Sequence, residues 1–247
     1  MSGHSAWANI KHKKMANDAK KGKIFSKIAK EMMICVRIGG KDPSSNITLR
    51  TLLQKARAAN MPSDNIERAI KRGAGEVEGE TFEEVMYEGY AAGGVGLIVQ
   101  VLTNNRNRAA AEVRHTFTRF NASFATQGSV MRSFQRRGVI LVDATKVAED
   151  QLMELVLEAG ANDLVRDSDQ FDIITDPAQF NNVVDALNKA NIPPVSAEVS
   201  LVSDTQVPIT DPDKAKQIIN FIDALEDMED VQNVYTNADI DAKLVEG

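Results

Sequence analysis

The sequence has few cysteines and aromatic residues and no long apolar run. Among its 247 residues there is one cysteine, Cys35, and one tryptophan, Trp7, and aromatic side chains make up 5%. A single cysteine excludes an intramolecular disulfide and is typical of a reducing compartment. The longest apolar segment, residues 95–102, is far shorter than the roughly 20 residues that span a membrane, and the N-terminus has no signal-peptide pattern. We therefore expect a soluble, cytoplasmic protein.

The motifs of common enzyme and metal sites are also missing. The three histidines, His4, His12 and His115, do not have the spacing of zinc ligands. There is no phosphate-binding glycine loop, dinucleotide fingerprint or nucleophile elbow. The acidic run 167–172 resembles half a calcium loop but lacks the glycine and the terminal glutamate. The sequence therefore predicts no catalytic residue, no metal and no cofactor.

Charges of opposite sign are segregated along the chain. Residues 1–75 carry 16 Lys/Arg and 5 Asp/Glu, a charge of +11, whereas the other 172 residues carry 13 and 30, a charge of −17. A polyanion responds to the local field and not to the net charge of −6. Residues 1–75 are thus the part expected to bind nucleic acid. The acidic remainder suits solubility or a basic protein partner.

The N-terminal cations are the main candidates for phosphate contacts. A helix is expected over residues 15–37, with lysines on one face and apolar side chains on the neighbouring face. Residues 1–41 contain two carboxylates, so salt bridges along this helix are mostly unavailable, and aromatic or imidazole side chains before it can stack on bases. The candidate residues are His4, Trp7, Lys11, His12, Lys13, Lys14, Lys20, Lys23, Lys27 and Lys30. The alternatives are a solvated helix face for the lysines and, for Trp7, packing against the helices.

A second candidate anion site is formed by Arg106, Arg108 and Arg114, at the start of a helix expected over 105–120. Arginine in a first helical turn opposes the helix dipole. The free N–H groups of that turn, together with guanidinium forks, nevertheless make a favourable anion site. The alternative is an internal ion pair with the acidic run 76–88.

Hydrophobic periodicity predicts an α+β protein of three domains. Residues 1–78 are expected to form a basic domain of three helices. Residues 138–203 have the order β-α-β-β-α-β of a ferredoxin-like unit. Residues 79–137 and 204–247 lack one strand for a second such unit, which residues 206–209 are expected to supply. The first unit is therefore predicted to be inserted into the second, discontinuous one.

Local signals place several element boundaries. A strand is expected over 129–135. Ser63 is expected to cap the third helix. Asp176 and Asp211, each followed by proline, are expected to cap two later helices.

Several strings in the sequence resemble the YebC family, whose mitochondrial member is a translational activator of cytochrome c oxidase. The resemblance covers essentially the whole chain. It implies an N-terminal helical domain and two α+β domains around a cleft. It also implies a non-enzymatic regulator of gene expression, described as a DNA-binding transcriptional regulator, with some members acting as translation factors. The strings are residues 1–30, 55–56, 59–62, 64–70, 87–90 and 105–108.

The predicted function is that of a non-catalytic nucleic-acid-binding regulator, with DNA or ribosomal RNA as the polyanion. No expected helix has an N-terminus rich in the side chains that read base edges in duplex DNA. This favours shape-directed binding, including structured RNA on a ribosome. The first alternative is therefore a ribosome-associated translation factor that relieves stalling. A protein-interaction adaptor using the acidic lobes is the second, and an enzyme using the cleft is the third.

Overall fold

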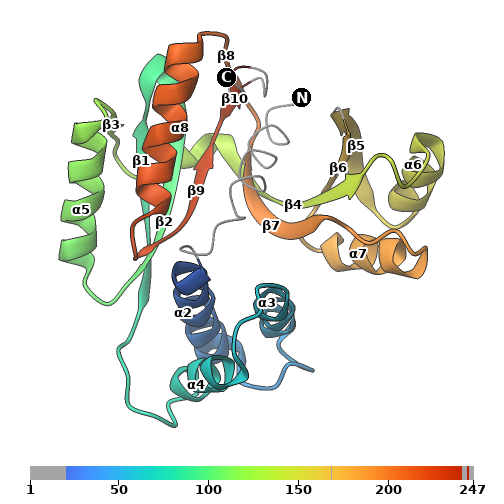
Figure 1. The fold of residues 1–247 in the computed structure, drawn as a ribbon, viewed down its shortest axis with the longest axis horizontal. Coiled ribbons are helices and arrows are strands. Elements are labelled where there is room, and N and C mark those ends of the chain that lie inside the picture. The colour runs from blue at the N-terminus through green and yellow to red at the C-terminus, as the bar shows by residue number, and fades with distance from the viewer. Residues whose placement is uncertain (1–20, 168, 241–243, 245–247) are drawn as a thin grey trace.

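The computed structural model describes residues 21–167, 169–240 and 244, and these form three parts (Figure 1). A unit of helices packs below one lobe built on an antiparallel sheet, and a second antiparallel lobe extends to one side. This arrangement confirms the predicted α+β class, with helices first and strand–helix domains after them. No helix in the described ranges has the length and apolar character needed to cross a bilayer.

The N-terminal part is a three-helix unit around one apolar core. Its helices are α2 (Lys21–Gly39), α3 (Ile47–Ala58) and α4 (Ser63–Gly73). Met32 and Leu49 are fully buried in the core between them. Helix α3 begins at a side-chain cap, because Asn46 Oδ1 accepts the N–H of Leu49 at 3.0 Å. Gly73 allows α4 to approach α2, since a Cβ there would lie 2.7 Å from the Met33 carbonyl oxygen.

The first lobe is a four-stranded antiparallel sheet with two helices on one face. The strands lie in the order β3-β1-β2-β9, so a strand near the C-terminus pairs with β2 from the first half of the chain. Side chains of both helices and of the sheet share one core, in which Phe117 and Phe221 meet edge to face at 4.9 Å. The elements are β1 (Glu83–Tyr90), β2 (Gly96–Thr103), α5 (Arg106–Arg119), β3 (Ser123–Phe124), α8 (Pro212–Glu226) and β9 (Val231–Thr236).

The second lobe has the strand order β5-β6-β4-β7, with all neighbours antiparallel. With its two helices this is the ferredoxin-like arrangement expected from the element order. Its core is separate from that of the first lobe and includes Phe171 and Leu152. The elements are β4 (Phe134–Asp143), α6 (Glu149–Glu158), β5 (Ala161–Asp167), β6 (Gln170–Thr175), α7 (Phe180–Lys189) and β7 (Ser196–Ser203).

The prediction that residues 206–209 complete the sheet of the first lobe is wrong. Strand β8 (Val207–Ile209) instead pairs in parallel with β10 (Ala238–Ile240) in a separate two-stranded sheet. The fourth strand of the lobe is the two-residue β3, which pairs with Gly89 and Tyr90 at the end of β1.

Three local predictions also differ from the structure. Residues 131–133 form a 3-10 turn. Of the strand expected over 129–135, only residues 134 and 135 are in a strand, as the first residues of β4. Residues 137 and 138, between which a domain boundary is predicted, both belong to β4. Ser63 is the first residue of α4 and not its cap. Helix α7 begins at Phe180, after a turn that contains Asp176 and Pro177.

Candidate nucleic-acid interface

Six of the predicted nucleic-acid-binding residues lie in the described part of the chain. These are Lys23, Lys27 and Lys30 on α2 and Arg106, Arg108 and Arg114 on α5. The other seven lie outside the described residues, and they are His4, Trp7, Lys11, His12, Lys13, Lys14 and Lys20.

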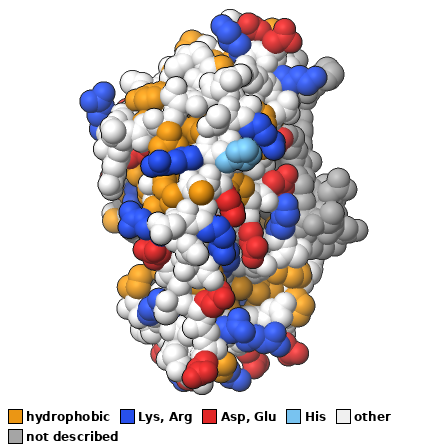
Figure 2. Space-filling view, turned by 90° about the vertical axis from the view of Figure 1, so that its left-hand side faces the viewer, with side chains coloured by type: hydrophobic (Ala, Val, Ile, Leu, Met, Phe, Trp, Pro, Cys, Tyr) orange, Lys and Arg blue, Asp and Glu red, His pale blue; other side chains and the backbone are white. Residues whose placement is uncertain are grey.

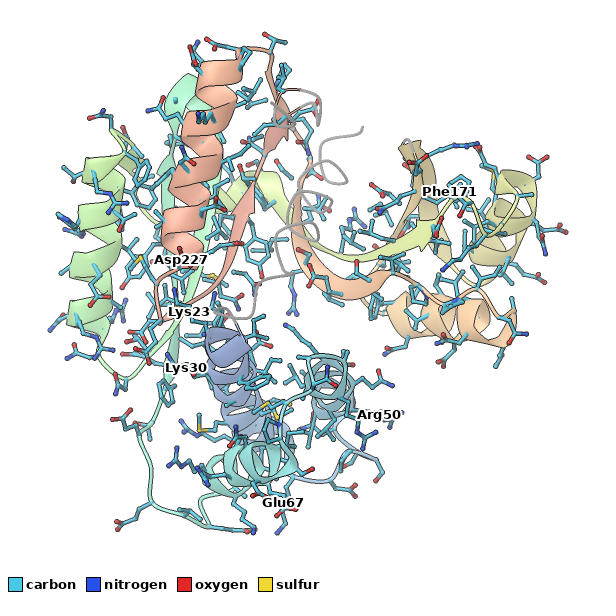
Figure 3. The ribbon with its side chains drawn as sticks, in the orientation of Figure 1. Lys23, Lys30, Arg50, Glu67, Phe171 and Asp227 are labelled. Carbon is cyan, nitrogen blue, oxygen red and sulfur yellow. The ribbon has the colours of Figure 1, made fainter. Side chains whose placement is uncertain are left out.

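The three α2 lysines each donate to oxygens at the end of α8 or in the loop between α8 and β9. Figure 3 shows Lys23 and Lys30 on the side of α2 near Asp227. Lys23 Nζ lies 3.1 Å from both the carbonyl oxygen and Oδ1 of Asp227. Lys27 Nζ donates to the Glu226 carbonyl at 2.9 Å. Lys30 Nζ donates to the Glu229 carbonyl at 3.1 Å. The acidic loop buries Lys30 and half-buries Lys27, whereas Lys23 stays exposed, so oxygens of the chain itself occupy part of the row that was expected to contact phosphate.

Asp230, at the end of this loop, links one helix of the helical unit with two elements of the first lobe. Its Oδ1 accepts from Lys30 at 2.9 Å, and its Oδ2 accepts from Thr103 at 2.8 Å and from Arg108 at 2.7 Å. Burial by itself would raise the pKa of this carboxyl. The hydrogen bonds from Lys30, Arg108 and Thr103 outweigh that effect and hold the pKa of Asp230 below its usual range. The ionised carboxylate of Asp230 therefore connects α2, the start of α5 and the end of β2 through hydrogen bonds.

The arginines of α5 have different surroundings from one another. Asn105 caps the helix by accepting the N–H of Arg108 at 3.1 Å. The Arg108 guanidinium is held by Asp230, so the internal ion pair is made with the α8–β9 loop and not with the acidic run 76–88. Arg114 lies over the Phe124 ring, 5.0 Å from its centroid. Arg106 has an exposed side chain.

The face that carries α5 is not a continuous basic patch. Figure 2 shows its positive side chains interspersed with acidic and apolar ones. Arg108 also lies 4.0 Å from Glu112 on the same helix. A polyanion would meet mixed charge on this face.

A groove between α2 and α4 was not predicted from the sequence, and its charged side chains, unlike those of the α5 face, are all positive. Its volume is about 310 Å³. Phe25, Met33 and Met61 give it an apolar lining, and Arg68 and Arg72 lie at its edge with exposed side chains. The described residues that line it include no carboxylate. Neither guanidinium has an ion-pair partner within the described ranges.

A sequence signal for this groove was present. Arg68 and Arg72 are four residues apart on α4, so they share one side of that helix. Ala69, which lies between them, is buried in the core. That this side of α4 forms a groove with α2 depends on how the two helices pack, and the spacing of the two arginines does not determine that packing.

The described residues contain no cluster of histidine, cysteine and acidic side chains able to hold a metal ion. Cys35 is half-buried, and burial raises the pKa of its thiol despite a hydrogen bond with Asn46. A raised thiol pKa disfavours the reactive thiolate.

Comparison with known proteins identifies the family of this chain. Residues 5–76 match the family model described as the TACO1/YebC protein N-terminal domain, and residues 82–238 match the TACO1/YebC second and third domain. A protein of Treponema pallidum named "probable transcriptional regulatory protein" is 50% identical over 245 residues, which cover 99% of this chain and 100% of the relative. A protein of Desulfotalea psychrophila with the same description is 46% identical, over 100% of this chain and 98% of the relative.

A solved structure shows the same fold. The crystal structure of a conserved hypothetical protein from Aquifex aeolicus superimposes with a TM-score of 0.82 at 43% sequence identity. The match covers 91% of this chain and 92% of the other. From the two family models, the curated relatives and this structure together, we conclude that the chain belongs to the TACO1/YebC family.

Proposed function

We propose that this protein is a non-enzymatic regulator of gene expression that binds nucleic acid through its three-helix unit. The observation that carries the proposal is the arginine-edged groove between α2 and α4, in a unit with a large excess of positive charge. Residues 21–75 carry 12 Lys/Arg and 4 Asp/Glu, an excess of eight. The names of the curated relatives, probable transcriptional regulatory proteins, support the regulatory role.

The groove has the chemistry of a site for an unpaired nucleotide. Phe25 offers a partly exposed aromatic ring on which a base can stack. Arg68 and Arg72 offer guanidinium groups for the adjoining phosphates. No carboxylate among the described residues lines this groove, and Arg72 also lines the neighbouring hollow, which carries Glu76, Glu78 and Glu80. Each phosphate that they neutralise releases a counterion, which favours binding at low salt.

The α5 arginines are proposed as a weaker second contact. Arg106 and Arg114 have exposed guanidinium-bearing side chains, whereas Arg108 is engaged by Asp230. Of the predicted arginines, Arg106 and Arg114 are therefore expected to contribute most to phosphate binding.

Structured RNA, including RNA on the ribosome, is the second candidate target. Helix α4 follows α3 after a four-residue turn, residues 59–62, which is the position of a recognition helix in a helix-turn-helix. Its first turn carries Asp64, and Glu67 follows one turn later. Carboxylates at these positions repel the phosphates that flank a major groove. This favours recognition of nucleic-acid shape over reading of duplex sequence.

The test is direct binding of the full chain to a short DNA duplex, to an RNA hairpin and to ribosomes. Wild type is compared with an Arg68→Ala/Arg72→Ala variant and with a Lys189→Ala/Lys216→Ala control, which removes the same charge from exposed positions of the acidic lobes. The proposal predicts binding to at least one target, weakened about tenfold in the arginine variant and little changed in the control. Equal weakening in both variants, or no binding to any target, would overturn it.

Binding to the three targets also distinguishes the two candidate functions, regulation of transcription and regulation of translation. Tight co-sedimentation with ribosomes beside negligible affinity for the duplex would assign the function to translation. The opposite result would assign it to transcription. Binding to none of the three would favour the protein-interaction adaptor.

A further inference from the structure

The C-terminal end of α8 is capped by another domain. A helix leaves its last carbonyl groups without partners, and its dipole makes that end negative. Helix α8 has no basic residue in its own last turn. Lys27 and Lys23, from α2, donate instead to the carbonyl oxygens of Glu226 and Asp227. The cations that stabilise this helix end therefore come from the unit that we propose binds nucleic acid.

The loop that receives these cations resembles a short polyanion. The segment 226–230 comprises the last residue of α8 and the loop after it, and four of its five residues are acidic, with Met228 as the exception. The lysines that meet it have the spacing i, i+4 and i+7, so they lie on one side of α2 over about 10 Å of helix axis. A regular row of ammonium groups against a row of oxygens is also the arrangement by which lysines contact phosphates.

The exposure of the lysine–loop contacts decreases from Lys23 to Lys30. At the outer end the side chains of Lys23 and Asp227 are 50% and 61% exposed, whereas at the inner end those of Lys30 and Asp230 are 8% and 6% exposed. Solvated ion pairs are weak and easily exchanged, whereas buried ones are costly to break. A competing anion would therefore displace the outer pair first.

The chain connection permits such a displacement. Residues 74–81, between α4 and β1, are all exposed, and they include Gly75 and Gly79. Gly75 has a φ of 74°, which glycine adopts without strain. The linker has ion-pair or hydrogen-bond contacts at Glu76 with Lys41 and at Glu80 with Asn104, both exposed. The linker itself is thus exposed along its whole length, and the helical unit is held to the first lobe by contacts outside it, at Phe82, which packs against the helical core, and between Lys30 and Asp230.

We propose that loop 226–230 is an internal competitor for the α2 lysine row, and that the phosphodiester backbone of a nucleic acid displaces it. In the closed form the loop occupies Lys23, Lys27 and Lys30. Displacement exposes these lysines to phosphate and releases the helical unit from the α8–β9 loop. This inference rests on the proposed nucleic-acid binding, and it adds an autoinhibitory contact to it.

The first test neutralises the two exposed carboxylates of the loop. An Asp227→Asn/Glu229→Gln variant keeps Asp230 in place and is compared with a Glu154→Gln/Asp185→Asn control, which removes the same charge from exposed positions of the second lobe. Binding to a DNA duplex and to an RNA hairpin should tighten about two- to tenfold in the loop variant and less in the control. Adding Lys23→Ala and Lys27→Ala to the loop variant should abolish the gain. Equal gains in loop variant and control would overturn the inference.

The second test measures the opening itself. Spin labels are placed at Ser45→Cys, before α3, and at Lys216→Cys, on α8, in a Cys35→Ser background; Ser45 and Lys216 are exposed. The distance between the labels should lengthen when the nucleic acid is added, and it should be longer without nucleic acid in the loop variant than in the control. Binding with an unchanged distance would overturn the inference and leave the proposed function standing. No binding to either probe would overturn both.

Discussion

Lys30 and Asp230 form a buried ion pair between residues that are 200 positions apart in the sequence, with Nζ 2.9 Å from Oδ1. Asp230 also accepts hydrogen bonds from Thr103 and Arg108. Lys30 in turn lies 5.3 Å from the centroid of the Phe82 ring, just before β1. The pair therefore ties the helical unit to the first lobe at a point where both partners are withdrawn from water.

Replacing Asp230 by Asn should lower the stability of the full chain markedly. The change leaves the buried Lys30 ammonium without its counter-charge and places an amide group against several donors. The expected loss is about 3 kcal/mol in the free energy of unfolding. Lys30→Met should cost less, about 1–2 kcal/mol, because Asp230 keeps Arg108 and Thr103 as donors. Urea denaturation followed by circular dichroism measures both.

The control for these variants is Asp185→Asn, at an exposed position of α7. Its effect should stay within about 0.5 kcal/mol. A larger loss for Lys30→Met than for Asp230→Asn would contradict the role of Asp230 as the shared acceptor.

The contribution of Asp230 should depend on pH only in the acid range. Since its folded-state pKa lies below the unfolded value of about 3.9, its stabilisation is present above that pH and is lost as pH falls through the folded value. The difference in urea midpoint between wild type and Asp230→Asn should thus be constant near neutrality and should shrink below about pH 4. A difference that already shrinks between about pH 7 and 6 would assign the effect to another group.

Glu88 should be essential for the loop that precedes β4. Its buried carboxylate accepts the N–H groups of Gly128, Val130 and Met131 at 2.6, 2.7 and 2.9 Å. Burial acts to raise the pKa of Glu88, but these three bonds outweigh it and lower the pKa. Glu88→Gln has one acceptor oxygen in place of two, so at least one N–H should lose its partner, at a cost of about 1–3 kcal/mol.

Hydrogen exchange provides the readout for that loop. The amides of Val130 and Met131 should exchange faster in Glu88→Gln, whereas those of β6, in the other lobe, should keep their protection. Unchanged protection of residues 128–131 would show that the carboxylate does not hold the loop.

Gly89 should not tolerate a side chain. A Cβ at this position of β1 would lie 2.1 Å from a Phe117 ring carbon and 2.5 Å from the Ser123 carbonyl oxygen. Gly89→Ala should therefore destabilise the first lobe by about 1–3 kcal/mol through overpacking. Gly22→Ala is the matched control, since no atom lies within 4 Å of a Cβ there and alanine favours the helix. Thermal unfolding of the two variants should shift in opposite directions, and equal shifts would contradict the packing account.

Two Asp-Pro pairs show how far local signals can be read from the sequence. Asp211 caps α8 as predicted, because its Oδ1 accepts the N–H of Asp213 at 2.9 Å, with Pro212 in the first turn. Asp176, followed by Pro177, does not cap α7. Its carboxylate is engaged by Arg137 from the neighbouring strand β4, and the helix starts at Phe180. A tertiary ion pair between distant residues decides the second case, and no local pattern contains it.

In the candidate site too, the features that depend on contacts between distant residues could not be predicted from local sequence patterns. The charge of α2 and its amphipathic pattern were readable, because they depend on residues within one helix. The covering of the lysine row by residues 226–230 depends on how α8 and α2 pack, about 200 residues apart. Strand β3 was missed because two residues carry no detectable alternation, and its position follows from pairing with β1.

The salt dependence of nucleic-acid binding tests the central claim most directly. The affinities of wild type and of Arg68→Ala/Arg72→Ala for one DNA duplex and one RNA hairpin are measured over a series of salt concentrations. If the two arginines neutralise phosphates, the slope of log affinity against log salt should become shallower by about 2 in the variant, roughly one unit per lost contact. Parallel slopes for wild type and variant would contradict binding through the α2–α4 groove.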